Sequence, residues 1–362
     1  MKITVTQENL VKALNTVSRV ASSRTTLPIL NNILLRTDNG QLSLTTTNLE
    51  LFIVDNINAK ITKDGVVTIP ACLITEFVNN LPKTNIDLKL DGDKLKISAG
   101  HYNSIINTTT PDDFPNPPEN KINSKFEIDS VIFKGAANQT VFAASGDTTR
   151  PVLTGVYLHT HEGNLYMTTT DGYRLAECRL MEQKENINSI IPITTVNEVV
   201  RVISDETKKI IIGISDDQIV FEIGSVKITS RLIDGKFIDY RQLIPGKTKN
   251  SASLDRSNFT QAVKIAELFA RESAESIIIK TNSEKQLLQI NSITSEFGEN
   301  KGVVEGKISG DESITLNAKY LLNALNVIDG DVVKIGFSSK LLPVLVTGEN
   351  DNYKHIIMPV KS

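Results

Sequence analysis

Two stretches of this chain repeat each other, "TLPILNNILLRTDNGQLSLTTTNLEL" at 26–51 and "TRPVLTGVYLHTHEGNLYMTTTDGYR" at 149–174. With a constant offset of 123 residues, prolines, leucines, a turn glycine and three consecutive threonines fall at equivalent positions. Each stretch is typical of strand, turn and strand, and Asn39-Gly40 favours a tight hairpin because both residues tolerate positive φ. The repeated hairpin indicates that the chain contains copies of one domain.

A strand followed by an amphipathic helix occurs three times, in "KITVTQENLVKALNTVSRVA" (2–21), "KFEIDSVIFKGAANQTVFAA" (125–144) and "SASLDRSNFTQAVKIAELFA" (251–270). Apolar residues three and four positions apart give each helix one buried face. A second helix recurs in "TIPACLITEFVNNL" (68–81), "IIPITTVNEVVRVI" (190–203) and "TLNAKYLLNALNVI" (315–328). Copies of about 120 residues are whole domains rather than solenoid units.

The linkers between the copies are polar. "TPDDFPNPPENKINS" (110–124) is rich in proline, and "PGKTKNSAS" (245–253) is basic. They place boundaries near 122 and 248, which predicts domains over 1–122, 123–248 and 249–362. Alternating segments such as "IDLKLDGDKLKIS" (86–98) predict strands. The predicted class is α+β, with three repeated domains that each pack two helices on antiparallel sheet.

Composition excludes several classes of protein. The 362 residues are 40% hydrophobic and 22% charged, which is typical of a soluble globular protein. No apolar run approaches the roughly 20 residues of a membrane span, and the N-terminus lacks a signal-peptide pattern, so we expect a cytoplasmic location. The net charge of −3 is unlike that of a compact basic nucleic-acid binder. Any nucleic-acid role must therefore use a local basic face or the topology of the molecule.

Residue patterns for catalysis are missing from the sequence, which contains neither a glycine-rich phosphate loop nor a nucleophile elbow. Cys72 and Cys178 lie far apart, which predicts neither a disulfide framework nor a metal site. His159 and His161 are two apart on a predicted strand, so they are either a metal pair or ordinary strand residues, and no acidic or cysteine cluster completes a site. We expect no cofactor, no metal and no catalytic residues, although catalytic residues can converge from distant positions.

The phrases "TLPIL" (26–30), "TRPVLTGV" (149–156), "TTDGYRLA" (169–176) and "IIMPV" (356–360) occur in this order along the triplicated chain. Together they resemble the bacterial DNA polymerase III β subunit family, the DNA sliding clamps, over essentially the whole chain. The resemblance implies a clamp fold in which two subunits join head to tail as a homodimeric ring. Such a ring encircles duplex DNA without sequence specificity and gives processivity in DNA replication as a non-enzymatic accessory subunit.

A modestly basic inner face is enough to centre DNA in a ring. In the first helix Lys12 and Arg19 are seven apart, opposite the apolar face, and Lys264 and Arg271 have the same spacing in the third domain. Each of these is equally well an ordinary solvated helix charge. The resemblance ranks Arg24 first among residues that face DNA, and the second domain adds Lys134, Arg150 and Arg201.

Ring closure requires an apolar seam between the first and third domains. The resemblance places Phe77 and Leu81 against Leu268 and Phe269. For Leu81 and Leu268, packing in the core of their own domain is a second interpretation.

The resemblance also implies a hydrophobic pocket between domains two and three. It would bind short peptides of the clamp loader, the DNA polymerase III α subunit, other polymerases and repair proteins through apolar anchors. Its expected residues are Leu153, Thr170, Gly172, Tyr173, Arg174, Leu175, Ile238, Leu243, Asn317, Tyr320, Leu342, Pro343, Ile356, Ile357, Met358, Pro359 and Val360.

Four positions depart from the family pattern. Ser362 ends the chain where a hydrophobic residue is common, Tyr173 replaces a frequent His, Gln242 replaces a common Arg, and Ala274 stands near the place of a Phe. These departures affect the shape and affinity of the expected pocket. The alternative hypotheses are a three-domain binding scaffold that shares the fold without forming a DNA ring, and an enzyme with scattered catalytic residues.

Overall fold

The chain forms two compact units in a computed structural model that describes residues 1–21, 27–38, 40–118, 121–271, 274–294 and 298–360. One unit contains Met1–Ser130 and Asn197–Leu232, and the other contains Val131–Val196 and Ile233–Ser362. The middle repeat is thus divided between the two units. Among the described residues, no helix is long and apolar enough to cross a membrane.

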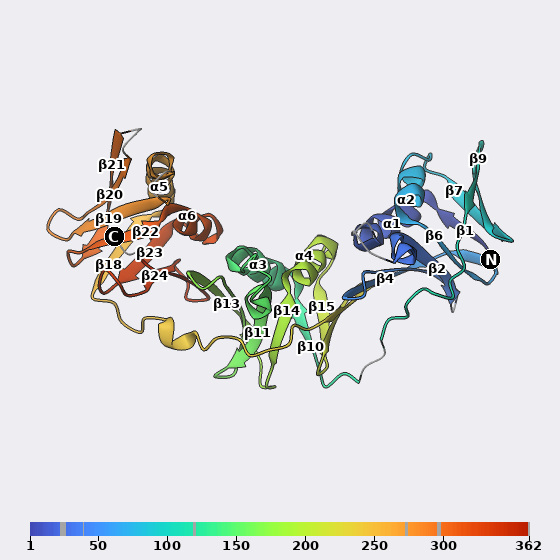
Figure 1. Ribbon diagram of the computed structural model, residues 1–362, viewed down its shortest axis with the longest axis horizontal. Helices are drawn as coiled ribbons and strands as arrows, with labels where there is room; N and C mark the ends of the chain where they lie inside the picture. The colour runs from blue at the N-terminus through green and yellow to red at the C-terminus, as the bar shows by residue number, and fades with distance from the viewer. Residues whose placement is uncertain (22–26, 39, 119–120, 272–273, 295–297, 361–362) are drawn as a thin grey trace. The chain divides into compact units, whose positions relative to one another are not determined.

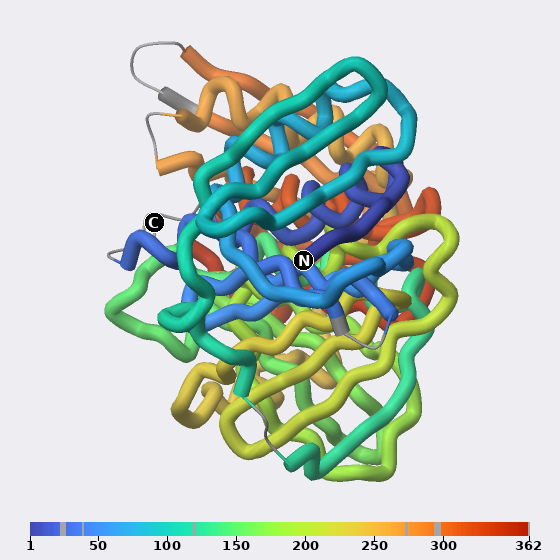
Figure 2. The backbone as a smooth tube through the Cα atoms, turned by 90° about the vertical axis from the view of Figure 1, so that its right-hand side faces the viewer, coloured from blue at the N-terminus to red at the C-terminus, as the bar shows by residue number. Residues whose placement is uncertain are grey.

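The first unit contains two antiparallel sheets, and α1 (Gln7–Ala21) packs beside α2 (Ala71–Asn79) (Figure 1). One sheet has the order β5 (Lys60–Lys63), β1 (Lys2–Thr6), β7 (Asn85–Asp91), β8 (Lys94–Ala99) and β9 (Tyr102–Asn107). The other has the order β10 (Ser124–Asp129), β15 (Lys209–Ile214), β16 (Gln218–Ile223), β17 (Val226–Arg231), β4 (Leu51–Asn58), β3 (Gln41–Thr47), β2 (Asn32–Asp38) and β6 (Val66–Pro70). Figure 2 shows β7, β8 and β9 as adjacent cyan segments.

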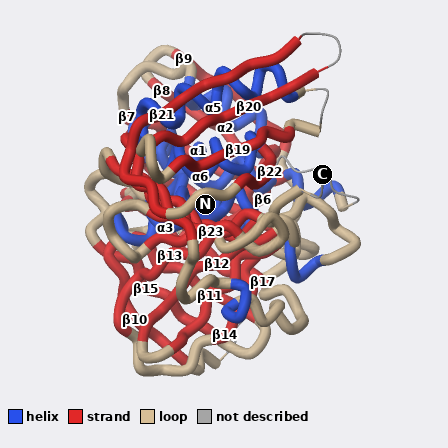
Figure 3. Tube along the Cα trace, turned by 90° about the vertical axis from the view of Figure 1, so that its left-hand side faces the viewer, coloured by secondary structure: helices blue, strands red, loops and turns tan. Residues whose placement is uncertain are grey.

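The second unit is built on one long antiparallel sheet. Its order is β14 (Asn188–Pro192), β11 (Gly155–His161), β12 (Asn164–Thr170), β13 (Arg174–Glu182), β25 (Tyr353–Ile357), β24 (Val344–Thr347), β23 (Val332–Phe337), β18 (Asn250–Asp255), β21 (Gly298–Ser309), β20 (Leu287–Thr294), β19 (Ser276–Asn282) and β22 (Ser313–Asn317). The helix α5 (Arg256–Ala270) packs on the long β20–β21 hairpin and beside α6 (Ala318–Val327) (Figure 3). The remaining helices are α3 (Ser130–Thr140) and α4 (Ile193–Val202).

The predicted helices are confirmed in all three repeats, and the predicted hairpins are confirmed in the first two. In α1 the predicted apolar face, which includes Leu10, Leu14 and Val17, is buried, and Lys12 and Arg19 are exposed opposite it. His159 lies on β11 and is buried, whereas His161 is only half-buried at the end of the same strand. No group of three or more metal-ligating side chains was found among the described residues.

The repeated threonines attach the first helix of a repeat to its sheet. The hydroxyl of Thr46 on β3 donates to the backbone oxygen of Val17 at 2.8 Å, and that of Thr169 on β12 donates to the oxygen of Thr140. The offset of 123 residues relates both donors and both acceptors. Because both hydroxyls are fully buried, their hydrogen bonds satisfy groups that would otherwise be costly to bury. The "TTT" phrase is therefore part of the common framework.

Two histidines are buried in the second unit without a charge. Burial lowers the pKa of His355 on β25 to about 3, with a further contribution from the nearby Arg174 cation. Burial also lowers the pKa of His159 to about 3, with Arg241 as the next cause. Both imidazoles are neutral in the folded chain near neutral pH, whereas an unfolded histidine binds a proton below about pH 6.5.

Acidification should destabilise this fold through these two side chains. Between about pH 6.5 and 3 the unfolded chain binds protons that the folded chain does not. As the pH falls through this range, each histidine therefore lowers the free energy of unfolding by about 1.4 kcal/mol per pH unit. Chemical denaturation at pH 7, 6 and 5 measures this slope, and His355→Asn should make it shallower. The exposed His101 provides a matched control, since His101→Asn should leave the slope unchanged. Equal slopes for His355→Asn and the unaltered chain would contradict a neutral buried His355.

Candidate functional site

The turn between β12 and β13 is fixed by side-chain acceptors. Asp171 Oδ1 accepts the backbone N–H of Tyr173 at 2.9 Å and that of Arg174 at 3.0 Å. The Thr170 hydroxyl oxygen accepts the N–H of Gly172 at 3.1 Å. Gly172 has a φ of 93°, a conformation that glycine adopts without steric cost. The sequence "TDGYR" thus sets one defined turn and directs Tyr173 to solvent, where 63% of its side chain is exposed.

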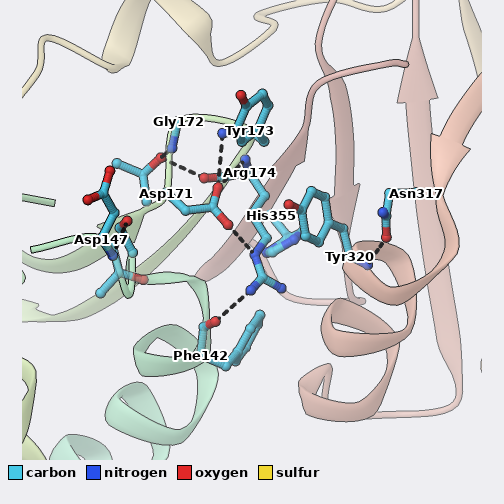
Figure 4. A network of polar contacts seen from close by, with 12 residues as sticks. Phe142, Asp147, Asp171, Gly172, Tyr173, Arg174, Asn317, Tyr320 and His355 are labelled. Carbon is cyan, nitrogen blue, oxygen red and sulfur yellow. Dashed lines mark hydrogen bonds and ion pairs between the residues drawn. The ribbon is translucent and has the colours of Figure 1, made fainter. Parts of the chain in front are cut away.

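The guanidinium of Arg174 is held on three sides (Figure 4). Its Nε donates to Asp171 Oδ2 at 3.0 Å and its Nη2 donates to the backbone oxygen of Phe142 at 2.8 Å. The group lies 4.5 Å from the ring centroid of Tyr320, a geometry that favours cation–π attraction. Nη1 is buried and has no hydrogen-bond partner among the residues that the structure describes. Arg174 therefore has one oriented N–H donor that no described residue accepts.

The C-terminal segment is joined to this turn by strand pairing. In the β13–β25 ladder Arg174 lies opposite Ile357, and Leu175 lies opposite Ile356. Beyond the ladder, Met358 donates its N–H to the oxygen of Tyr173 at 2.8 Å, and Val360 donates to the oxygen of Thr315 at 2.9 Å. The backbone thus carries the tail past the "DGYR" turn and toward α6.

The start of α6 adds the next part of the site. Asn317 caps the helix, because its Oδ1 accepts the N–H of Tyr320 at 3.1 Å. This cap fixes the first turn of the helix, from which the Tyr320 ring reaches the Arg174 guanidinium (Figure 4). An asparagine that sequence reasoning assigned to a pocket therefore also has a structural task.

A buried ionic network anchors the segment that follows residue 233. Glu177 on β13 is 1% exposed, and its carboxylate accepts the Tyr240 hydroxyl and lies 3.1 Å from Nη2 of Arg241. Tyr240 and Arg241 belong to the connecting segment around η4 (Arg241–Leu243). A buried carboxylate is tolerated only when it is paired and hydrogen-bonded. Tyr240 provides the hydrogen bond and Arg241 provides the opposite charge. We call Glu177, Tyr240, Arg241 and His159 the anchor network.

Aromatic packing surrounds the anchor network. His159 Nε2 lies 3.0 Å from the Tyr240 hydroxyl, and the Tyr157 ring stacks on His159 at 4.2 Å and on Phe237 at 4.6 Å between centroids. Burial raises the pKa of Tyr240, and the Glu177 carboxylate adds to the shift, so the phenol stays protonated as a donor. The connecting segment is thereby held on the sheet.

The connecting segment presents two of the predicted pocket residues to solvent, because Ile238 is 40% exposed and Leu243 is 39% exposed. Other exposed members of the predicted set are Gly172, Tyr173 and Leu342. A second group is half-buried: Arg174, Asn317, Tyr320, Pro343, Met358, Pro359 and Val360. A third group is buried and lies beneath the surface: Leu153, Thr170, Leu175, Ile356 and Ile357.

Leu175 and Ile356 share one core cluster with Phe237 and Tyr240. The structure thus links the predicted β13 and β25 residues to the connecting segment, while the turn, the tail and α6 are linked through Arg174 and the tail hydrogen bonds. Sequence reasoning missed Phe142, His355 and the anchor network. For Tyr240 a signal existed: the first copy has Pro117 at the equivalent position, so the tyrosine is specific to the second copy.

The predicted DNA-facing residues differ in their exposure. Lys12, Arg19, Lys264 and Arg271 are exposed and Lys134 is half-buried. Arg150 is exposed but pairs with Asp147 at 3.3 Å. Arg24 lies outside the described residues.

Arg201 is held by neighbouring groups. Its Nε donates to Glu198 at 2.8 Å, and its Nη2 donates to the oxygen of Thr16 at 2.7 Å near the end of α1. The Glu198 carboxylate offsets the charge of Arg201, as expected for an Arg three residues after a Glu on a helix, and both contacts fix its direction. Arg201 thus has a structural role in the chain, and its contact with DNA stays a prediction.

The predicted seam residues also divide into two kinds. Leu268 on α5 is 54% exposed, and Phe269 and Phe77 are half-buried. Leu81 is 7% exposed, so the second interpretation, packing within its own domain, holds for this residue.

Sequence reasoning missed Tyr102 and Ile105, which are exposed on β9 at the edge of its sheet. Two large apolar residues among polar neighbours on an edge strand are a signal for a protein interface.

Three models of one protein family match almost the entire chain. They are the N-terminal domain of the DNA polymerase III beta subunit over residues 1–118, the central domain over 127–239 and the C-terminal domain over 241–361. The beta sliding clamps of Staphylococcus epidermidis and Bacillus subtilis are each 29% identical to the chain, with full coverage of both proteins.

Solved structures agree with this match. A crystal structure of the DNA polymerase sliding clamp from Pseudomonas aeruginosa has a TM-score of 0.95 and 29% identity over the full length of both chains. That of Bacillus subtilis has a TM-score of 0.95 and 27% identity, and covers 99% of that chain. The family models, the full-length relatives and the matching fold show that the chain belongs to the DNA polymerase III β subunits, the non-catalytic sliding clamps of DNA replication.

Proposed function

We propose that this sliding clamp acts as a head-to-tail homodimeric ring in the cytoplasm and binds partner peptides at the surface around Arg174. The proposal keeps the domain boundaries near 122 and 248. The clamp loader, the DNA polymerase III α subunit, and other polymerases and repair proteins are its proposed partners. The single observation that carries the peptide site is the buried Arg174 Nη1, which has no hydrogen-bond partner in the described part of the chain, beside half-buried and exposed apolar side chains.

A bound peptide would supply the hydrogen-bond acceptor that Arg174 Nη1 lacks. An unpaired buried donor costs about 1–3 kcal/mol, and a peptide carbonyl that accepts from Nη1 removes this cost. Leu and Phe side chains of a peptide would pack against residues such as Met358, Pro343 and Tyr320, which are half-buried in the free chain. Met358 adapts its shape to different anchors because its side chain is unbranched and flexible. Sliding clamps of Pseudomonas aeruginosa and Bartonella birtlesii were crystallised bound to griselimycin, so clamps of this fold hold a ligand.

Ring closure is supported by open strand edges. β9 pairs only with β8 among the described strands, and its Tyr102 and Ile105 face solvent. In β21, residues 298–305 pair with β20 on one side, and β18 pairs only with the other end of the strand, residues 306–309. Among the described strands, the second side of residues 298–305 is therefore open. Leu268 and Phe269 on α5 belong to the same C-terminal repeat as β21. Val303 on the open part of β21 is also exposed. Two open edges with exposed apolar side chains suit a head-to-tail contact between two copies.

The proposed grip on DNA is topological. The net charge is −3, and the exposed cations Lys12, Arg19, Lys264 and Arg271 lie on the first helices of two repeats or just beyond. Weak phosphate contacts suit a protein that slides, because each tight contact adds a barrier to movement along the duplex.

Arg174→Ala should weaken binding of a peptide from the DNA polymerase III α subunit roughly tenfold or more, which corresponds to about 1.4 kcal/mol. The variant loses the free donor and the cation over Tyr320. Calorimetric titration measures the affinity. Arg179→Ala is the matched control, since Arg179 lies on the same strand but bonds Asn352 at 3.1 Å, away from the proposed surface. An equal loss in both variants would place the site elsewhere.

Leu268→Asp should convert the dimer, with twice the chain mass of 39.8 kDa, into monomers. A carboxylate in an apolar seam is desolvated without a partner, which opposes association. Light scattering after size exclusion gives the mass. Leu342→Asp, another exposed leucine replaced by aspartate, should leave the dimer intact because it lies in the proposed peptide surface. Persistence of the dimer in Leu268→Asp would remove α5 from the seam.

Clamp loaded onto nicked circular duplex DNA should stay bound through gel filtration and leave after a restriction enzyme linearises the circle. The reason is that a closed ring escapes only over a free end, whereas phosphate contacts alone are insensitive to linearisation. Retention on the linear product at the same salt concentration would show that charge, and not topology, holds the protein.

A further inference from the structure

The junction between β4 and β17 in the first unit repeats the backbone of the proposed peptide site. Asn48 Oδ1 accepts the N–H groups of Glu50 and Leu51 at 3.1 and 2.8 Å, just as Asp171 accepts those of Tyr173 and Arg174. The Thr47 hydroxyl oxygen accepts the Leu49 N–H at 2.9 Å, as Thr170 does for Gly172.

The strand pairing also matches in register. Thr229 lies opposite Phe52 in the β4–β17 ladder, where Ile356 lies opposite Leu175 in the β13–β25 ladder. Arg231 donates its N–H to the oxygen of Glu50 at 3.0 Å, which is the equivalent of the bond from Met358 to Tyr173. The two junctions therefore share one backbone conformation and strand register, and they differ in their side chains.

A cavity of about 360 Å³ lies at this first junction. Its walls include the apolar side chains of Leu49, Phe52, Pro115 and Pro118 and the charged side chain of Arg231. A neighbouring cavity of about 400 Å³ shares Pro118, Gln218 and Thr229 with it. Both volumes fall in the range of ligand pockets. We call the two cavities together the junction trough.

Leu49 has an unusual conformation for a leucine. Its φ is 76°, at the position where the second copy has Gly172, and its side chain is 40% exposed. A non-glycine residue in this region costs of order 1 kcal/mol, and such outliers concentrate at binding sites. The turn hydrogen bonds of Thr47 and Asn48 hold this conformation, and Leu49 lines the cavity with an exposed side chain.

The charges of the trough select the chemistry of its ligand. Lys125, Lys227 and Glu222 line one of the two cavities, and Lys125 is paired with Glu222 at 3.3 Å. Arg231 and Glu50 line the other. Arg231 is exposed and forms no ion pair with the described part of the chain. The excess of cations favours a peptide with carboxylates near its apolar anchor.

We propose that the junction trough is a second docking site, which binds an extended acidic peptide of a partner protein with an aliphatic or aromatic residue against Leu49 and Phe52 and a carboxylate on Arg231. The class of ligand, an extended peptide, rests on the proposed function of the matching site in the second unit. The second site differs in selectivity, since Leu51 takes the place of Arg174 and Arg231 takes the place of Met358.

The probe is a fluorescein-labelled peptide, Asp-Leu-Phe-Asp-Glu, titrated by fluorescence anisotropy into the full-length clamp. In the Arg174→Ala/Met358→Ala background, which removes the proposed first site, a weaker saturable binding phase should remain. Adding Arg231→Glu should weaken this phase at least tenfold, whereas Arg36→Glu, an exposed charge reversal on β2, should not. No remaining phase, or an equal effect of both reversals, would overturn the proposal.

Leu49→Gly separates a binding role from a structural one. Glycine relieves the backbone cost at φ 76°, so the melting temperature should stay level or rise while the remaining binding phase is lost. Unchanged binding would remove Leu49 from the site. If Arg174→Ala/Met358→Ala leaves the stronger phase unaltered, the proposed first site fails, but Arg231→Glu still tests the trough.

Discussion

Antiparallel pairing between the strand edges of successive repeats is the interaction on which this structure depends. β4 pairs with β17, and β13 pairs with β25, so each sheet runs on across a repeat boundary. Unpaired backbone groups at an edge attract another strand, and these pairings satisfy them within the chain. The middle repeat is divided between the two compact units because its strands belong to both continuous sheets. The open edge of β9 remains, and in the proposed ring a second copy of the chain satisfies it in the same way.

The same pairings create the candidate sites. Where β25 ends beside Tyr173, the tail continues past Arg174, and β17 ends with Arg231 beside Glu50. The frame is common to both junctions, and the side chains on it are not. The anchor network illustrates this specialisation, since Glu177, Tyr240 and His159 correspond to Val54, Pro117 and Arg36 in the first copy. A buried carboxylate requires its partners to be present together, so these residues function only as a set.

Periodic patterns predicted most of the fold, because they are local. The buried face of α1, the hairpins around the "TTT" phrases and the order of strand and helix in each repeat follow from spacing alone. Pairing of β4 with β17 joins residues far apart in the chain, and no local pattern indicates it. Phe142 contributes a backbone oxygen to Arg174, which any residue type could supply, so its identity gave no signal. Arg201 was assigned to DNA from its charge, and its pairing with Glu198 one turn away was not considered.

The candidate site combines a rigid frame with an incomplete interior. Hydrogen bonds to Asp171 and Phe142 hold Arg174 so that its remaining donor has a defined direction before any ligand arrives. Preorganisation of this kind reduces the entropy lost on binding, whereas the unpaired donor and the exposed Ile238 and Leu243 lower the stability of the free chain. The buried pairing of Glu177 with Arg241 offsets part of that cost by fixing the connecting segment that carries both apolar residues. The stabilising anchor network and the unsatisfied donor of Arg174 thus belong to the same candidate site.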